Sequence, residues 1–271
     1  MISSEFLQSL TGTNLNIRRI ELGGNPHEFQ TKLKLEGGIE HFCEYFKFKL
    51  QVIRLEYCTM IGEEAIKVIA RTMGANLREL AVVRNFTEKL AKISDSAFFE
   101  LSNHCPNLKR LEILYSRRFG DKLGEYLGSG TLQNLEYLDL SNCTIVTSLE
   151  SLCTGCPNLK EFKLAGDSWI RDLVLRSIAK HKNIRTFHLG HYEHSDCDCK
   201  SVVPQDPVFS DYSAQGVQVS SIFKDQQNFS ALETLYLEKN CEMTKFLTQM
   251  IGKYRPELRI RFNRNFSALT Y

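Results

Sequence analysis

Residues 50–58 read LQVIRLEYC, and residues 135–143 read LEYLDLSNC. In both segments the apolar residues are spaced by three and then by two positions, and a cysteine follows three positions later. Apolar residues that alternate with polar ones over such a short run are typical of a half-buried β-strand. The two segments therefore predict the same local structure at two places in the chain.

The same frame recurs along the whole chain. Six further copies begin at Ile17, Leu77, Leu108, Leu159, Ile184 and Leu232, and a degenerate copy, LRIRF, spans residues 258–262. A stretch with helical spacing follows most copies, such as Ala65, Ile66, Ile69 and Met73. One strand and one helix cannot bury their apolar faces alone, so the copies must stack. The sequence predicts one α/β solenoid domain over residues 1–271, with about eight repeats and a degenerate C-terminal one.

Two copies are introduced by the same four residues, CPNL, at 105–108 and 156–159. Together with Cys58 and Cys143, these segments resemble the cysteine-containing leucine-rich repeat family. That family belongs to the ribonuclease-inhibitor-like class and is common in F-box proteins, which select substrates for ubiquitin ligases. The resemblance covers about residues 17–262 and implies a right-handed α/β horseshoe, with a parallel sheet on the concave side and helices on the convex side. No segment ahead of the first repeat resembles an F-box.

Composition and charge narrow the classes of partner and compartment. The chain has 34 Lys and Arg against 32 Asp and Glu, a net charge of +2, so no overall field favours nucleic acid or anionic lipid. No run approaches eighteen consecutive apolar residues, which argues against membrane insertion. Nine cysteines, an odd number, indicate reduced thiols in a reducing compartment, so we expect a cytoplasmic or nuclear protein.

The motifs of enzymes and cofactor-binding proteins are missing from the sequence. It contains no glycine-rich phosphate loop, no Gly-x-Ser-x-Gly turn and no recognisable pair of catalytic carboxylates. Cys153 and Cys156 have the spacing of a redox motif, but they fall at a predicted helix end before a repeat, where core cysteines are expected. We therefore expect a non-enzymatic protein without a cofactor.

Side chains that alternate with the buried leucines face outward on the predicted concave sheet. Both charge signs are interleaved there, which suits a protein partner with its own mixed charges. The alternative is that ion pairs between neighbouring strands satisfy these charges, although we expect the carboxylates of the row to be solvated. The candidate binding residues are Arg54, Glu79, Arg110, Glu112, Tyr137, Asp139, Glu161, Lys163, His188 and Tyr236.

Aromatic and arginine residues directly after the strands form a candidate rim of this surface, because these residue types often anchor interfaces. A buried capping role is the alternative for Trp169, the single tryptophan. The rim candidates are Tyr57, Tyr115, Arg117, Trp169 and Tyr192.

One interval between copies, from Ile184 to Leu232, is swollen to 48 residues, which predicts an insertion loop at about 190–231. His191, His194, Cys197 and Cys199 lie near its start and are residue types that bind zinc. Their spacing differs from that of a zinc finger, so a polar solvated loop is favoured over a metal site.

These observations favour a protein–protein interaction module. The family resemblance implies the substrate-recognition part, or a relative, of an F-box-type ubiquitin-ligase receptor, with a ligase adaptor as one partner. A structural or assembly subunit of a large multiprotein complex is the alternative.

Overall fold

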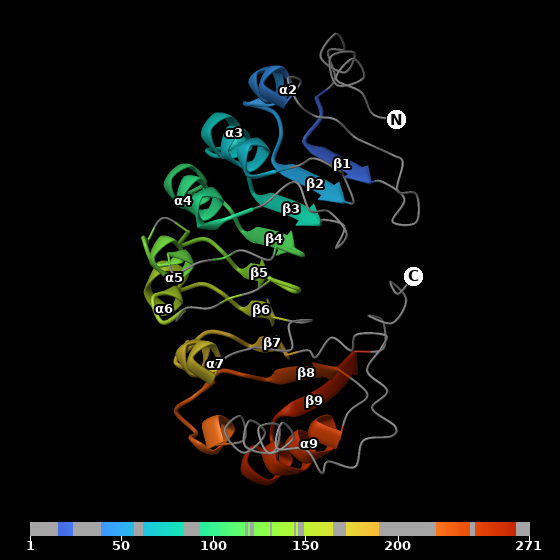
Figure 1. Ribbon diagram of the computed structural model, residues 1–271, viewed down its shortest axis with the longest axis vertical. Helices are drawn as coiled ribbons and strands as arrows, with labels where there is room; N and C mark the ends of the chain where they lie inside the picture. The colour runs from blue at the N-terminus through green and yellow to red at the C-terminus, as the bar shows by residue number, and fades with distance from the viewer. Residues whose placement is uncertain are drawn as a thin grey trace, which may run out of the picture.

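One parallel sheet and one layer of helices make up the described part of the chain (Figure 1). The computed structural model describes residues 16–23, 39–56, 62–83, 93–116, 119, 122–130, 132–143, 145, 149–164, 172–189, 221–238 and 242–263. Nine strands in these ranges follow one another in the sheet in chain order, from β1 to β9. This is an α/β leucine-rich repeat solenoid, as the repeated frame predicts.

The strands and helices alternate along most of the chain. The strands are β1 (Arg19–Gly23), β2 (Val52–Glu56), β3 (Glu79–Val83), β4 (Arg110–Leu114), β5 (Tyr137–Asp139), β6 (Glu161–Leu164), β7 (Thr186–Leu189), β8 (Thr234–Glu238) and β9 (Arg259–Asn263). The helices are α2 (Ile39–Phe46), α3 (Glu63–Met73), α4 (Asp95–His104), α5 (Leu123–Leu127), α6 (Leu152–Gly155), α7 (Asp172–Ala179) and α9 (Glu242–Tyr254).

The register of the sheet confirms the frame read from the sequence. Ile53 of β2 lies beside Leu80 of β3, which lies beside Leu111 of β4 and then Leu138 of β5. All four side chains are buried between the sheet and the helices. Adjacent strands lie about 4.8 Å apart whereas packed helices need about 8–10 Å, so the stack bends with the sheet on its inner side (Figure 1).

A row of asparagines ties successive repeats together at the turns that lead from helix to strand. Each side-chain amide donates a hydrogen bond to a backbone carbonyl of the preceding repeat. The bonds run from Asn76 to Lys47 (2.8 Å), Asn107 to Ala75 (2.8 Å), Asn134 to Pro106 (2.9 Å), Asn158 to Gln133 (2.8 Å) and Asn183 to Pro157 (2.7 Å). We call this row the asparagine ladder.

The cysteines in the described ranges are free thiols, and four of the five are buried. Cys143, directly after β5, faces inward, and its thiol donates a hydrogen bond to the carbonyl of Ile113, 3.0 Å away. Burial raises the pKa of Cys156 to about 12, so it is a packing residue, as expected. Cys58 lies outside the described residues.

The last repeats are held together by stacked aromatic rings. Phe187 stacks on Phe162 with 5.9 Å between ring centroids and on Phe229 with 5.4 Å, and Phe229 stacks on Phe223. Phe223 and Phe229 fall within the insertion predicted at about 190–231. Residues 190–220 lie outside the described ranges, but residues 221–231 are part of the stack and do not leave it.

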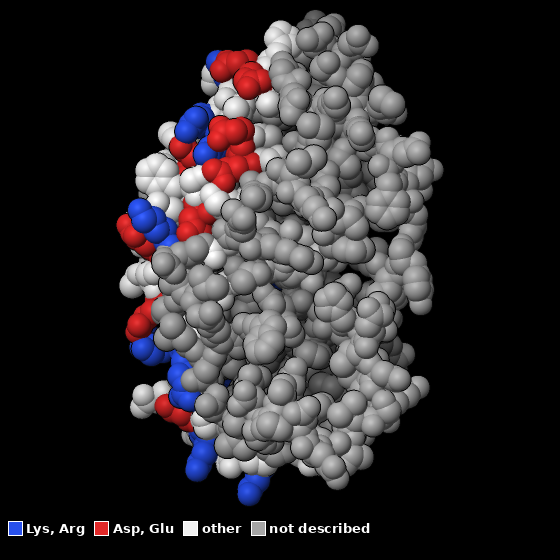
Figure 2. Space-filling view, viewed as in Figure 1, with Lys and Arg blue, Asp and Glu red and all other residues white. Residues whose placement is uncertain are grey.

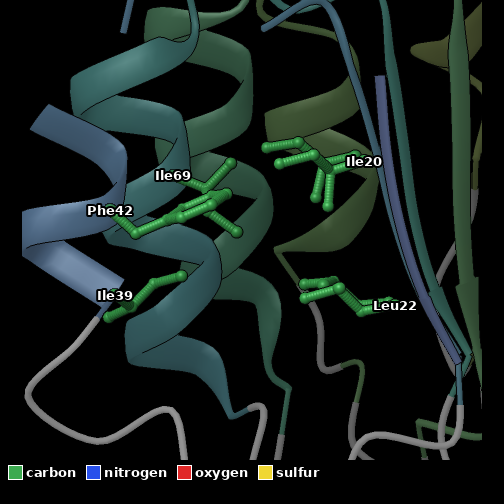
Figure 3. Close-up of a pocket in the computed structure, with 7 residues that line it drawn as sticks. Ile20, Leu22, Ile39, Phe42 and Ile69 are labelled. Atoms are coloured by element: carbon green, nitrogen blue, oxygen red, sulfur yellow. The ribbon is translucent and has the colours of Figure 1, made fainter. Parts of the chain in front are cut away.

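A small hollow remains in the core at the N-terminal end of the sheet, between β1 and helices α2 and α3 (Figure 3). Its walls carry apolar side chains alone, so it offers no group that could orient a polar ligand or an ordered water. We regard it as a packing imperfection of the first repeat. Its lining residues are Ile20, Leu22, Ile39, Phe42, Ile53, Leu55 and Ile69.

Candidate protein-binding surface

All ten residues predicted for the concave face lie on the strands, on the side opposite the buried leucines. Two rows cross the sheet. The register places Arg54, Glu112, Asp139, Lys163, His188 and Tyr236 in one row, together with Ala81. It places Glu79, Arg110, Tyr137 and Glu161 in the other. The sheet therefore brings together every predicted concave residue.

Charges are matched across strands at the N-terminal end of this face. The guanidinium of Arg54 on β2 donates two hydrogen bonds to the Glu112 carboxylate on β4, at 3.2 and 3.1 Å. It reaches across β3 because Ala81, which lies between them in the row, has only a methyl side chain. Arg110 lies 2.5 Å from the same carboxylate. Glu112 is only 6% exposed, so our expectation that it is solvated is wrong: two arginines cover it.

The first strands extend this network. Arg19 on β1 pairs with Glu21 at 2.5 Å and lies 3.8 Å from Glu79, while Arg54 also pairs with Glu56 at 3.1 Å. Burial alone would lower the pKa of Arg54, but its bonds to Glu112 and Glu56 raise that pKa above its usual range. We call this set the paired region; it comprises Arg19, Glu21, Arg54, Glu56, Glu79, Arg110 and Glu112.

Tyr137 and Asp139 on β5 are also buried rather than presented to solvent. The Arg110 guanidinium lies 3.5 Å from the centroid of the Tyr137 ring, and the Lys163 ammonium lies 5.0 Å from it. The Tyr137 hydroxyl and the Ser141 backbone N–H approach the Asp139 carboxylate at 3.2 and 2.9 Å. Asp139 is 6% exposed, and burial raises its pKa despite these bonds. The expectation that Asp139 is solvated is therefore wrong as well.

The C-terminal part of the face is built differently. The rings of His188 on β7 and Tyr236 on β8 are stacked, with centroids 4.1 Å apart and planes 2° apart. His188 lies 3.2 Å from the Glu161 carboxylate, and Lys163 lies 3.4 Å from it. Burial alone would raise the pKa of Glu161, but its bond to His188 and the nearby Lys163 charge lower it.

Two arginines follow on β9, the last strand. Arg259 lies beside Thr234 and Arg261 beside Tyr236, so both belong to the same two rows. Both are exposed, and no ion pair joins either of them to another described residue. Both are absent from the ten predicted residues, although their alternation in LRIRF was a usable signal. We call His188, Tyr236, Arg259 and Arg261 the cationic end.

Most other candidates lie outside the described residues. These are Tyr57, Arg117, Trp169 and Tyr192 of the rim and His191, His194, Cys197 and Cys199 of the insertion. Tyr115 is described: it has a positive φ of 61°, and its backbone N–H donates to the carbonyl of Ser141 at 3.2 Å. Within the described ranges, no three metal-binding side chains lie close enough together to hold an ion.

Charged groups on the convex helices are interspersed in sign, as the visible helix layer in Figure 2 shows. Some of them hold the helices in place. The Glu63 carboxylate of α3 accepts hydrogen bonds from the Ser94 backbone N–H (3.0 Å) and from the hydroxyls of Ser94 and Ser96 at the start of α4. Burial opposes ionisation of Glu63, but these bonds and Lys67 lower its pKa to about 2. Among the described helices, none has both the length and the apolar content needed to cross a bilayer.

Sequence comparison agrees with the repeat architecture over one segment of the chain. A family model described as Leucine Rich Repeat matches residues 134–156, which include β5 and α6. A similar solved structure is the crystal structure of the Rad7 and Elc1 complex in yeast, with a TM-score of 0.49 and 14% sequence identity. The similarity covers 97% of this chain and 69% of that chain.

Proposed function

We propose that this chain is a non-enzymatic protein-binding module that holds an acidic surface of its partner at the cationic end of the concave sheet. One observation carries the proposal. Every arginine of the paired region lies against a carboxylate, whereas Arg259 and Arg261 project from the same face and form no ion pair with any carboxylate among the described side chains. A partner that supplies carboxylates would complete the pattern.

The chemistry of the cationic end suits such a partner. Arg259 and Arg261 lie two positions apart on one strand, so their side chains leave the same face about 7 Å apart. Guanidinium groups bind carboxylates through two parallel hydrogen bonds, which fixes the orientation as well as the contact. Beside them, the ring of Tyr236 is held in place by stacking on the buried ring of His188. Such ordered aromatic groups lose little entropy on binding.

The competing explanation is protective. An edge strand exposes unpaired backbone groups, and charged side chains on it discourage edge-to-edge association. In that case the two arginines would affect aggregation and would contribute nothing to partner binding. The two explanations therefore differ in a measurable way.

The test is the affinity of the native partner, identified by mass spectrometry in the complex purified with the wild-type chain. Arg259→Glu with Arg261→Glu should weaken binding at least about tenfold, because the new carboxylates repel the acidic surface of the partner. It should also make the affinity less dependent on salt concentration, because the attraction between opposite charges is lost. The matched control is Lys122→Glu with Lys182→Glu, two exposed lysines away from the concave strands. Unchanged affinity of the β9 variant, with increased aggregation, would favour the protective explanation.

The finer form of this proposal is a substrate receptor, or a relative of one, for an F-box-type ubiquitin ligase in the cytoplasm or nucleus. It rests on the resemblance carried by the two CPNL segments and on the free thiols of the described cysteines. Quantitative binding of the full-length gene product to a purified cullin adaptor tests it. Reproducible absence of binding would remove the ligase role and leave the protein-binding role intact.

A structural subunit of a large complex is the alternative, and one observation favours it. Phe99 on the convex helix α4 is 45% exposed and packs edge-on against Tyr126 of α5, with 5.2 Å between ring centroids. Phe99 is thus an exposed aromatic ring beside a partly buried one on the helix layer, and it indicates contacts away from the concave sheet. Co-fractionation with a large particle, lost in Phe99→Ser and kept in the β9 variant, would support this alternative.

A further inference from the structure

We propose a second docking surface, on the helix-to-strand edge of the first repeats, for an acidic protein segment that places an apolar side chain against Phe48. This surface is separate from the concave sheet. It does not depend on the function proposed for the cationic end. Three features carry the inference: a rigidly displayed phenylalanine, an apolar row that continues from it, and a row of cations beside that row.

Phe48 is displayed by a rigid turn. It lies between α2 and β2 and is 81% exposed, although its neighbours Phe46 and Leu50 are fully buried. The backbone N–H groups of Lys49 and Leu50 both donate to the carbonyl of Phe46, at 2.9 and 3.0 Å. The turn is therefore anchored on both sides by the core, and the aromatic ring is held in solvent. An aromatic ring kept in water by a fixed backbone is a feature of binding surfaces.

An apolar row continues from Phe48 along the edge. Ala75 and Pro106 occupy the corresponding turns of the next two repeats, and both are exposed. The asparagine ladder holds these turns side by side, because Asn76 binds the carbonyl of Lys47 and Asn107 binds that of Ala75. The spacing of the three apolar residues is thus set by hydrogen bonds and does not depend on flexible loops.

A row of cations runs beside the apolar row. Backbone hydrogen bonds link Gln51 to Arg18 (2.8 Å), Arg78 to Gln51 (2.7 Å) and Lys109 to Arg78 (2.8 Å), so these residues lie side by side, each directly before one of the first four strands. Arg18, Arg78 and Lys109 are exposed. Arg18 and Arg78 form no ion pair with any described residue, and Lys109 shares the Glu136 carboxylate with Lys160. The edge therefore carries positive charge at Arg18 and Arg78 that no described carboxylate offsets.

Charge complementarity selects the occupant. An apolar strip flanked on one side by cations fits a segment with apolar and acidic residues on the same face. Nucleic acid would require a longer basic track, whereas this chain carries a net charge of only +2. A bilayer surface would require more than one large apolar anchor to hold the protein stably. An acidic protein segment uses both rows at once.

The test uses a short fluorescein-labelled peptide of aspartate and glutamate with one central tryptophan, and measures fluorescence anisotropy with the full chain at low ionic strength. The wild-type chain should bind it. Phe48→Ser should weaken binding about tenfold through lost aromatic contact, and Arg18→Glu with Arg78→Glu should weaken it further. Replacing the peptide tryptophan by serine should weaken wild-type binding as much as Phe48→Ser does.

Two controls separate this surface from the others. Phe99→Ser removes another exposed phenylalanine and should leave the affinity unchanged. Arg259→Glu with Arg261→Glu reverses the two arginine charges of the cationic end and should leave the contribution of Phe48 unchanged. Circular dichroism of each variant verifies that it is folded.

Several outcomes would overturn the proposal. One is failure of the peptide to bind, and another is equal binding by wild type and Phe48→Ser. Tighter Phe48-dependent binding to phosphatidylserine vesicles or to a single-stranded oligonucleotide than to the peptide would assign the surface to a membrane or a nucleic acid. Concentration-dependent dimers in sedimentation that disappear in Phe48→Ser would assign it to a second copy of this chain.

Discussion

The two ends of the concave sheet place arginine in opposite environments. In the paired region, the guanidinium of Arg54 is enclosed by Glu56 and Glu112, while at the cationic end Arg261 pairs with no described carboxylate. Both arginines occupy the same row of the sheet. The difference lies in the neighbouring strands, which supply Ala81 and Glu112 in one case and Tyr236 in the other. The pairing of a charge in a solenoid is therefore determined by the adjacent repeats.

This contrast divides the face into a part that stabilises the sheet and a part available to a partner. A bidentate pair that is mostly shielded from water is costly to break, because either partner left alone is a desolvated charge. An exposed arginine without a partner contributes little to folding. The same residue type thus serves stability at one end and recognition at the other.

The largest expected effect tests whether the core contributes equally to the free energy of unfolding at the two ends of the sheet. Leu138→Ala on β5 and Leu235→Ala on β8 should each reduce the free energy of unfolding by about 2–5 kcal/mol, because both side chains are fully buried and each change leaves a cavity. Urea unfolding followed by circular dichroism measures both. A much smaller loss for Leu235→Ala would show that the last repeats unfold separately. The paired region and the cationic end would then differ in local stability as well as in the pairing of their charges.

The contrast itself predicts a smaller, unequal pair of effects. Glu112→Ala should cost about 2–3 kcal/mol, because it leaves the half-buried Arg54 and Arg110 without their shared carboxylate. Arg261→Ala should change stability by less than about 0.5 kcal/mol. Equal costs in urea unfolding would contradict the division into a paired region and a cationic end. A double-mutant cycle of Arg54→Ala with Glu112→Ala isolates the energy of the pair.

The smallest predicted effect is a pH dependence with opposite sign at two neighbouring carboxyl groups. The raised pKa of Asp139 means that its stabilising contribution is present at acidic pH and declines as pH rises from the usual aspartate pKa through the raised value. Asp139→Asn should therefore gain stability relative to wild type over that interval, by less than about 1 kcal/mol. Urea midpoints measured from pH 4 to pH 8 test this.

Glu161 provides the matched comparison. Its lowered pKa means that its contribution is present above the usual glutamate pKa and is lost as pH falls through the lowered value. At neutral pH, Glu161→Gln should be less stable than wild type by about 0.5–1 kcal/mol, because solvent screens the partly exposed carboxylate. In acid, the stabilities of the variant and the wild type should become equal. The same sign for both variants would contradict the assigned environments of the two carboxyl groups.

The sequence was sufficient for the fold because the buried positions repeat. The spacing that begins at Leu50 and at Leu135 places Ile53, Leu55, Leu138 and Leu140 in the core, as observed. The alternation also identified the outward-facing residues correctly. Period-two alternation depends on the backbone of one strand alone, so each copy could be interpreted by itself.

Exposure of the outward-facing residues was not predictable in this way. Glu112 and Asp139 face away from the core, but Glu112 is covered by arginines from its own and another strand, and Asp139 is bound by the backbone of the turn after β5. The bond from Arg54 to Glu112 joins residues 58 positions apart and requires the small Ala81 between them. Only the three-dimensional register makes such a contact visible. The alternative raised from the sequence was ion pairing between neighbouring strands. Ion pairs do satisfy the charges in the first half of the face, but they run within one strand or between strands two apart.

The asparagine ladder restricts where a chain of this kind can gain or lose residues. Its asparagines are separated by 31, 27, 24 and 25 residues, yet each makes the same bond to the repeat before it. The helix-to-strand turns are therefore fixed in pitch, and gains or losses of residues must be absorbed between each strand and the following helix. The ladder is interrupted after Asn183, where Ala231 precedes Leu232 in place of asparagine. The interval between repeats is also longest at that junction. This is expected if insertions are tolerated best where no asparagine side chain bonds one repeat to the preceding one.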